Sequence, residues 1–121
     1  MTKKKTLVLG ASANPARYSY LAVNSLHAKG HEVIAIGKRV GKAGQVQVET
    51  ERKDINDLDT VTLYLNAGNQ KQYYDYIFSL HPNRIIFNPG AENQELFSMA
   101  QKKGILAQEA CTLVLLSTGQ Y

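Results

Sequence analysis

The chain has 121 residues, of which 44% are hydrophobic and 20% are charged, and its formal net charge is +4. This length predicts one compact domain over residues 1–121 and excludes a second one, while the composition excludes extended disorder. A positive charge permits binding of polyanions, but the basic residues are dispersed and no nucleic-acid motif accompanies them. We therefore expect a small phosphorylated ligand rather than nucleic acid.

No part of the sequence indicates a membrane or secreted protein. The longest candidate for a membrane segment is the apolar run at residues 113–116, far below the ~20 residues that a spanning helix needs. The lysine-rich start leads into an apolar run that stops at Gly10, which is too short for a signal peptide. The single cysteine, Cys111, excludes an internal disulfide and is typical of a reducing compartment. We expect a soluble cytoplasmic protein.

Five short apolar runs predict the strands of a sheet, at residues 6–9, 32–36, 61–65, 84–87 and 105–107. Helix-like stretches lie between most of them, and this alternation indicates parallel strands joined by crossover helices. The runs are apolar at consecutive positions, as in central strands that are buried on both faces. The predicted fold class is α/β: a Rossmann-like, doubly wound, mainly parallel five-stranded sheet with helices on both faces.

Three helices are expected between the strands, because apolar residues recur at helical spacing between capping residues. The first begins at Ser19 as its N-cap and ends at Gly30, the second covers residues 70–80, and the third covers residues 93–103. Residues 111–117 fit a closing helix or a further strand, and we favour the helix. Residues 37–59 are expected to form an irregular connection with at most one short helix, near residues 55–58.

The turn at residues 10–19 lies between the first strand and the first helix, where a Rossmann-like fold binds phosphate. Gly10 matches the first glycine of the dinucleotide fingerprint G-x-G-x-x-G, but Ser12 stands at the second, which weakens a prediction of classical NAD binding. Ser12 and Asn14 can donate hydrogen bonds to phosphate, and Arg17 offers a guanidinium beside them. Alternatively, Ser12 and Asn14 satisfy the turn backbone and Arg17 is solvated. We favour phosphate binding because strand, turn and helix follow in the right order.

Basic residues follow the second predicted strand, at the position where an NAD-binding protein places an acidic residue on the ribose. The sequence there is Gly37-Lys38-Arg39, with Lys42 shortly after. Positive charge favours a phosphorylated ribose, which occurs in NADP as the 2′-phosphate and in coenzyme A as the 3′-phosphate. The alternative is that Lys38, Arg39 and Lys42 belong to an ordinary solvated loop.

Short turns rich in Asn and Gly follow the third and fourth predicted strands. Asn66 opens the first of them, and Asn88 and Gly90 lie in the second. Because parallel strands bring these turns to the same edge of the sheet, their amides are suited to a pyrophosphate or a pantetheine arm. Asn and Gly are also the commonest turn formers, so a purely structural role fits them equally well.

Residues for catalysis are few. His27, His31 and His81 have no sequence partner that suggests a triad or a metal site, so we expect structural or surface roles for them and no metal. Cys111 follows the last predicted strand, where it either approaches a bound thiol or is buried and inert. No catalytic residue is predicted.

Taken together, these residues resemble one family, the small stand-alone CoA-binding-domain proteins, which are similar to the amino-terminal domain of the succinyl-CoA synthetase alpha subunit. The resemblance covers essentially the whole chain and rests on Gly10-Ala11-Ser12 with Asn14-Pro15 and Arg17, Gly30-His31-Glu32-Val33, Lys38 with Gly41 and Gly44, Asn88-Pro89-Gly90 with Glu92-Asn93, and Ala110-Cys111. It implies a Rossmann-type domain. In such a domain the first turn receives the CoA phosphates, the basic residues hold the phosphorylated adenosine end, and the later turns border the pantetheine.

We therefore expect a protein that binds coenzyme A or an acyl-CoA without catalysis of its own. The chain departs from the family at Ile36-Gly37, where Asn-Pro is more frequent, and at Ala110-Cys111-Thr112, where stand-alone relatives often have Arg-Cys-Pro. The sequence contains neither the phosphohistidine segment nor the ATP-grasp partner of the synthetases, so synthetase activity is not implied. The alternatives are an NADP-dependent oxidoreductase and a nucleotide-regulated interaction module, whose partner is another protein or a second copy in a homodimer.

Overall fold

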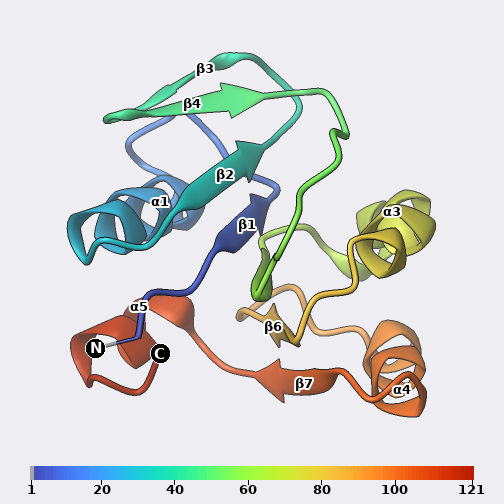
Figure 1. Ribbon diagram of the computed structural model, residues 1–121. Coiled ribbons are helices and arrows are strands. Elements are labelled where there is room, and N and C mark those ends of the chain that lie inside the picture. Colours follow the sequence, from blue (N-terminus) through green and yellow to red (C-terminus); the bar gives the residue numbers. More distant parts are fainter. Residues whose placement is uncertain (1) are drawn as a thin grey trace.

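A seven-stranded sheet runs through the middle of the molecule in the order β3-β4-β2-β1-β5-β6-β7 (Figure 1). The computed structural model describes residues 2–121. All neighbouring strands are parallel except β3, which pairs with β4 in the antiparallel sense. The elements are β1 (Thr6–Leu9), α1 (Tyr18–Ala28), β2 (Val33–Ile36), β3 (Gly41–Ala43), β4 (Val46–Glu49), β5 (Thr60–Leu63), α2 (Ala67–Gln70), the 3-10 helix η1 (Lys71–Tyr73), α3 (Tyr74–Ser79), β6 (Arg84–Phe87), α4 (Gln94–Lys102), β7 (Leu106–Glu109) and α5 (Thr112–Ser117).

Helices cover both faces of the sheet, with α1 and α5 on one face and α3 and α4 on the other (Figure 1). Each face has its own hydrophobic core: Val8 of β1 belongs to the core beneath α1 and α5, whereas Leu7 and Leu9 belong to the core beneath α3 and α4. Every residue of β1, β5 and β6 is buried, as expected for central parallel strands. The predicted α/β class with a Rossmann-like, mainly parallel sheet is confirmed.

The predicted number of five strands is wrong, because the connection over residues 37–59 contains the hairpin β3–β4. Its strands are joined by a two-residue loop between the paired residues Ala43 and Val46, and Gly44 in that loop has a positive φ of 63°. Both strands are short and only partly buried, so their apolar signal is weak. The connection has no helix near residues 55–58, where Ile55 and Leu58 are instead buried in the core on either side of a turn at residues 56–57.

The predicted helices exist, with shifted boundaries. Helix α1 begins one residue before the expected cap, so Arg17 is the N-cap and Ser19 is buried inside the first turn of the helix. The helix expected at residues 70–80 is divided into α2, η1 and α3 and starts earlier, with Asn66 as its N-cap. Helix α4, expected over residues 93–103, has Asn93 as its N-cap, and the closing helix is confirmed as α5. Strands β2, β5 and β7 differ from the expected ranges by one or two residues at their ends.

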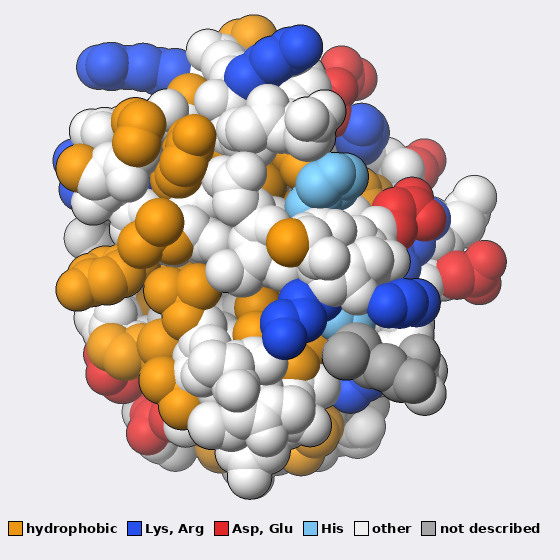
Figure 2. Space-filling view, turned by 90° about the vertical axis from the view of Figure 1, so that its left-hand side faces the viewer, with side chains coloured by type: hydrophobic (Ala, Val, Ile, Leu, Met, Phe, Trp, Pro, Cys, Tyr) orange, Lys and Arg blue, Asp and Glu red, His pale blue; other side chains and the backbone are white. Residues whose placement is uncertain are grey.

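The layer formed by α1 and α5 carries no Asp, Glu, Lys or Arg, since its sequences are YSYLAVNSLHA and TLVLLS. Its exposed surface includes the apolar side chains of Tyr18, Leu21 and Val114. Figure 2 looks at this side of the molecule and shows hydrophobic side chains gathered over one half of it. The helices of the other layer are balanced, with Lys71 and Lys102 against Asp75 and Glu95, so the net positive charge is carried by the loops. No helix in the described part of the chain is long and apolar enough to cross a bilayer.

Candidate functional site

The carboxyl ends of β1, β2, β5 and β6 meet at one edge of the sheet, which we call the carboxyl edge. From β1 the chain passes to β2 on one side and later to β5 on the other, so the strand order reverses beside β1. Ligands of open α/β sheets bind at such a switch point. The first turn, residues 10–17, follows β1 and therefore lies at this point.

Hydrogen bonds within the first turn fix its shape. Gly10 has a φ of 93°, a conformation that favours glycine, and its N–H donates to the carbonyl oxygen of Ile36 at 2.9 Å. Ser12 Oγ accepts from Asn14 N–H at 3.0 Å, and Asn14 Oδ1 accepts from Ala16 N–H at 3.0 Å. The side-chain oxygens of Ser12 and Asn14 thus stabilise the turn. The Ser12 hydroxyl hydrogen and the Asn14 amide NH₂ donate to no acceptor within residues 2–121, so both remain available to a ligand.

Helix α1 starts at the first turn without a side-chain cap. Its N-cap is Arg17, and the first backbone hydrogen bond of the helix joins Leu21 N–H to Arg17 O at 3.3 Å. The N–H groups of residues 18–20 have no acceptor among residues 2–121. Free N–H groups and the positive end of an eleven-residue helix attract an anion. The start of α1 therefore has the groups that suit a phosphate-sized anion.

Two glycines hold the loop after β2 against the first turn. A Cβ added to Gly37 would lie 2.1 Å from the carbonyl oxygen of Ala11, and a Cβ added to Gly41 would lie 2.7 Å from Ala13 Cβ. Only residues without a Cβ allow this close approach. Because both ends of the segment 37–41 rest on the first turn, the loop that carries Lys38 and Arg39 lies beside the first turn.

Four cationic residues, in the first turn, in the loop after β2 and in β3, have no acidic partner. Arg17, Lys38, Arg39 and Lys42 are all exposed, and none makes a side-chain hydrogen bond or an ion pair with any of residues 2–121. The ion pairs found within residues 2–121 are formed by Lys5 and Lys53 instead. This edge of the sheet therefore presents uncompensated positive charge, which suits a ligand with more than one phosphate group.

The later turns contribute one exposed amide and one exposed backbone turn. Asn66 is exposed, and its Oδ1 caps α2 by accepting from Asn69 N–H at 2.9 Å, which leaves its NH₂ group without a protein acceptor in the described residues. Gly90 is exposed with a φ of 90°, and its N–H donates to Glu92 Oε1 at 2.9 Å. A Cβ on Gly90 would meet nothing within 4 Å, so only its backbone conformation requires glycine.

Asn88 differs from the other predicted site residues, because its amide faces inward and is 1% exposed. Its Nδ2 donates to Thr62 Oγ1 at 2.6 Å and to Leu63 O at 2.9 Å, while its Oδ1 accepts from Thr112 N–H at 2.8 Å. These bonds connect β5, β6 and the start of α5. Both donors of the amide are used, so Asn88 supports the carboxyl edge from beneath and offers no donor to a ligand.

Tyr64 and Cys111 lie beneath the same edge. Tyr64 follows β5, and a Cβ on Gly10 would lie 2.9 Å from the Tyr64 carbonyl carbon. The Tyr64 hydroxyl is buried without a hydrogen-bond partner in the described residues, and burial raises its pKa well above the ordinary value. Cys111 is partly buried at the N-cap of α5. Its exposure is therefore intermediate between the two alternatives expected from the sequence, a cysteine that approaches a bound thiol and one that is buried and inert.

The three histidines lie away from the carboxyl edge. His27 is in the last turn of α1, His31 precedes β2, and His81 follows α3. His31 is 4% exposed, and its Nδ1 accepts from Lys4 N–H at 2.9 Å. Burial lowers the pKa of His31, and the positive charges of neighbouring lysines lower it further. His31 is thus a neutral, structural residue, and no group of three possible metal ligands occurs among residues 2–121.

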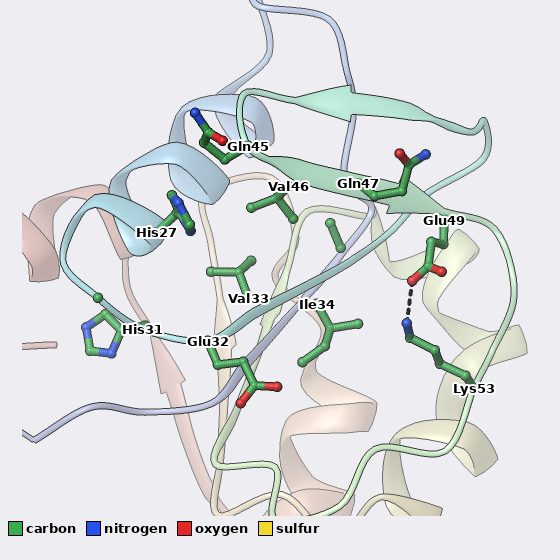
Figure 3. A pocket seen from close by; sticks show the side chains of 12 residues that line it. His27, His31, Glu32, Val33, Ile34, Gln45, Val46, Gln47, Glu49 and Lys53 are labelled. Atoms are coloured by element: carbon green, nitrogen blue, oxygen red, sulfur yellow. Dashed lines mark hydrogen bonds and ion pairs between the residues drawn. The ribbon is translucent and has the colours of Figure 1, made fainter.

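An open groove of about 580 Å³ lies at the amino ends of β2 and β4, away from the carboxyl edge (Figure 3). There β2 and β4 pair only through Ala35 with Val48 and Ile36 with Glu49, and their amino-terminal halves separate. An ion pair between Glu49 and Lys53 borders the groove. None of the predicted site residues lines it, so its shape does not bear on the predicted phosphate site.

Three residues that shape the carboxyl edge were not among the predicted site residues: Gly37, Gly41 and Gln70. A glycine directly after a buried strand indicates a close approach, so Gly37 carries a usable signal. Gln70 has none, because a glutamine in a helix usually faces water, whereas here it is fully buried.

Several solved structures share this fold. A crystal structure of an uncharacterized protein is 46% identical to this chain, and the match covers 100% of both chains with a TM-score of 0.96. A hypothetical protein from Pyrococcus horikoshii OT3 is 19% identical over 96% of this chain and 83% of that chain, with a TM-score of 0.84. A protein from Thermus thermophilus is 16% identical over 98% of this chain and 91% of that chain, with a TM-score of 0.82. The likeness to the last two shows the fold alone.

A comparison with curated proteins found no match. The family model described as a CoA binding domain matches residues 4–117, which is nearly the whole chain. The matched range includes the first turn, the loop with Lys38 and Arg39, and both later turns. The resemblance inferred from the sequence is thereby confirmed, and the chain belongs to the CoA-binding domain family.

Proposed function

We propose that this chain binds coenzyme A at the carboxyl edge, with the phosphates of CoA on the first turn and the start of α1. The observation that carries the proposal is the uncapped start of α1, where free N–H groups lie beside the unpaired Arg17. Membership of the CoA-binding domain family supports the same ligand. Free CoA and an acyl-CoA share every phosphate that this edge would bind, so the proposal includes both.

The pyrophosphate, the 3′-phosphate and the pantetheine arm of CoA each have a matching group at this edge. The pyrophosphate accepts hydrogen bonds from the N–H groups of residues 18–20 and from the Arg17 guanidinium. The 3′-phosphate of the ribose lies near Lys38 and Arg39, whose loop rests on the first turn. The pantetheine arm then passes over the ends of β5 and β6, between Asn66 and Gly90.

We further propose that the chain acts by binding and does not catalyse a reaction on its own. Hydroxyl, amide and cationic groups at the carboxyl edge are suited to holding a ligand. His31, which is the most buried histidine, is committed to the backbone of Lys4 at the other edge of the sheet. This arrangement supports a module that presents CoA to another protein.

Arg17→Ala tests the phosphate site. Loss of a charge-assisted hydrogen bond to phosphate costs about 1.5–3 kcal/mol, so the dissociation constant for CoA should rise about tenfold or more. Lys102→Ala is the matched control, because Lys102 is also exposed and without a side-chain partner in residues 2–121, but lies in the last turn of α4. Isothermal titration calorimetry measures both. Equal affinities in the two variants would remove Arg17 from the site.

Thermal unfolding with CoA, dephospho-CoA, NADP and NAD tests the identity of the ligand. A ligand at 100 times its dissociation constant stabilises the folded state by about 2.7 kcal/mol. We expect the largest stabilisation with CoA and a smaller one with dephospho-CoA, because the latter lacks the 3′-phosphate assigned to Lys38 and Arg39. Stabilisation by NADP alone, or by none of the four compounds, would refute the proposal.

A further inference from the structure

A buried glutamine connects the two later turns of the carboxyl edge. Gln70, the last residue of α2, is completely buried. Its Nε2 donates to Leu65 O at 2.7 Å and to Ala91 O at 2.8 Å, and its Oε1 accepts from Asn93 Nδ2 at 2.8 Å. A buried amide is costly unless its groups are hydrogen-bonded, and here both donors and the acceptor are used. Gln70 thus holds the turn after β5 at a fixed distance from the turn after β6.

The network continues from Gln70 to the surface. Asn93 Nδ2 also donates to Tyr74 Oη at 2.8 Å, and the Tyr74 hydroxyl donates to Glu95 Oε1 at 3.0 Å. Asn93 Oδ1 accepts from Leu96 N–H at 3.2 Å and so caps α4. Burial raises the pKa of Tyr74, which keeps its phenol in the form that donates. The network therefore anchors the start of α4 to both turns.

The turn that Gln70 holds also touches the first turn. A Cβ added to Gly10 would lie 3.0 Å from Leu65 Cγ and 2.9 Å from the carbonyl carbon of Tyr64. On the other side, Ala91 directly follows Gly90, and its N–H donates to Asn88 O at 2.8 Å. A continuous wall therefore runs from the phosphate-binding first turn through Leu65 and Gln70 to Ala91.

We propose that Gln70 is a positioning residue that fixes the distance between the turns after β5 and β6, over which the pantetheine arm passes, and thereby strengthens the binding of CoA more than that of its nucleotide part. This inference rests on the proposed CoA binding. Gln70 is buried and does not touch the ligand. It acts through the Leu65 and Ala91 carbonyls, which only a side chain with two donors at this place can hold together.

The test compares CoA with 3′-phospho-ADP, which is CoA without its pantetheine arm. In Gln70→Glu, a carboxylate oxygen replaces the donor and faces the Leu65 and Ala91 carbonyls, so the two turns separate. We expect the dissociation constant for CoA to rise about tenfold, equivalent to about 1.4 kcal/mol, while that for 3′-phospho-ADP changes less than about twofold. Gln101→Glu is the matched control, because Gln101 is exposed on α4 and makes no side-chain hydrogen bond within residues 2–121.

A milder variant keeps the test decisive if Gln70→Glu fails to fold. Tyr74→Phe removes only the hydroxyl that joins Asn93 to Glu95, and it should weaken CoA binding about two- to fivefold with 3′-phospho-ADP unaffected, the size of one ordinary hydrogen bond. Equal losses for both compounds, or no loss for either, would overturn the role of Gln70. If the wild-type chain binds neither compound, the proposed function fails as well, so the two failures are distinguishable.

Discussion

Gly37→Ala probes the contact that holds the basic loop against the first turn. The new Cβ would lie 2.1 Å from Ala11 O and 3.1 Å from Ala11 C, both backbone atoms that no side-chain rotation can move aside. The end of β2 must therefore separate from the first turn. This separation strains the hydrogen bond from Gly37 N–H to Glu49 O at 2.8 Å and the bonds to Ile36 O from the first turn.

The expected cost is that of an overpacked core, about 1–3 kcal/mol of unfolding free energy. With an unfolding entropy of about 2.1 cal/mol/K per residue, a chain of 121 residues loses about 4 °C in melting temperature for each kcal/mol. Gly37→Ala should therefore melt about 4–12 °C lower than the wild type. Because the first turn and the basic loop move apart, the stabilisation by CoA should also fall.

Gly68→Ala provides the control, because a Cβ at Gly68 in α2 would have its nearest neighbour, Asn66 Oδ1, at an ordinary 3.5 Å. Replacing such a glycine by alanine is neutral or stabilises by up to about 1 kcal/mol. Differential scanning calorimetry with and without CoA measures both variants. If Gly37→Ala has the same melting temperature as Gly68→Ala and is stabilised by CoA to the same extent, the first turn is not held by this contact and the reasoning is wrong.

Three further variants test separate parts of the structure. The double variant Lys38→Ala with Arg39→Ala should raise the dissociation constant for CoA about tenfold and leave that for dephospho-CoA nearly unchanged, as calorimetry can measure. His31→Gln should flatten the pH dependence of stability: the lowered pKa of His31 means that the unfolded chain is protonated first as the pH falls below 6.5, so the wild type loses stability there. Asn88→Leu should lower the unfolding free energy, measured in urea, by about 1–3 kcal/mol for each group it leaves unsatisfied, the Thr112 N–H among them.

The first two of these predictions have outcomes that would contradict them, and an unchanged unfolding free energy in Asn88→Leu would contradict the third. Equal losses for CoA and dephospho-CoA would separate Lys38 and Arg39 from the 3′-phosphate, and an unchanged pH profile in His31→Gln would exclude this histidine as its source. The titration of the Asp59 carboxyl does not interfere with this test of the pH profile. Burial raises its pKa, but hydrogen bonds from Thr60 and Asn83 and the positive charges of Arg84 and Lys4 together outweigh burial and leave the pKa lowered, so its contribution is lost mainly below pH 3.8.

The central part of the fold was predictable because its signals are local. β1 and β6 consist of four consecutive apolar or buried residues, and each is followed by a glycine- or asparagine-containing turn. Such runs belong to strands buried on both faces, whose order along the chain implies parallel pairing. The junction of β1, first turn and α1 was predictable for the same reason, since Gly10 and the following helix are adjacent in sequence.

Features that depend on distant contacts were not predictable. The β3–β4 hairpin becomes part of the sheet through two residue pairs between β2 and β4. No local pattern in its short strands predicts these pairs. The glycine at position 37 signals a close approach, but its partner, Ala11, lies on another loop and has no local signal. The burial of Gln70 requires acceptors on two turns that only the folded chain brings together.

The structural and the ligand-binding interpretations of the site residues are compatible at some positions and exclusive at others. Asn14 and Asn66 each use the side-chain oxygen to hold a turn and keep the NH₂ group free of protein acceptors within residues 2–121. Their structural bond therefore orients a donor for a ligand at no further entropic cost. Asn88, in contrast, donates both hydrogens of its NH₂ group to Thr62 Oγ1 and Leu63 O. Three asparagines with the same sequence signal thus divide into two that can face CoA and one that holds the frame beneath it.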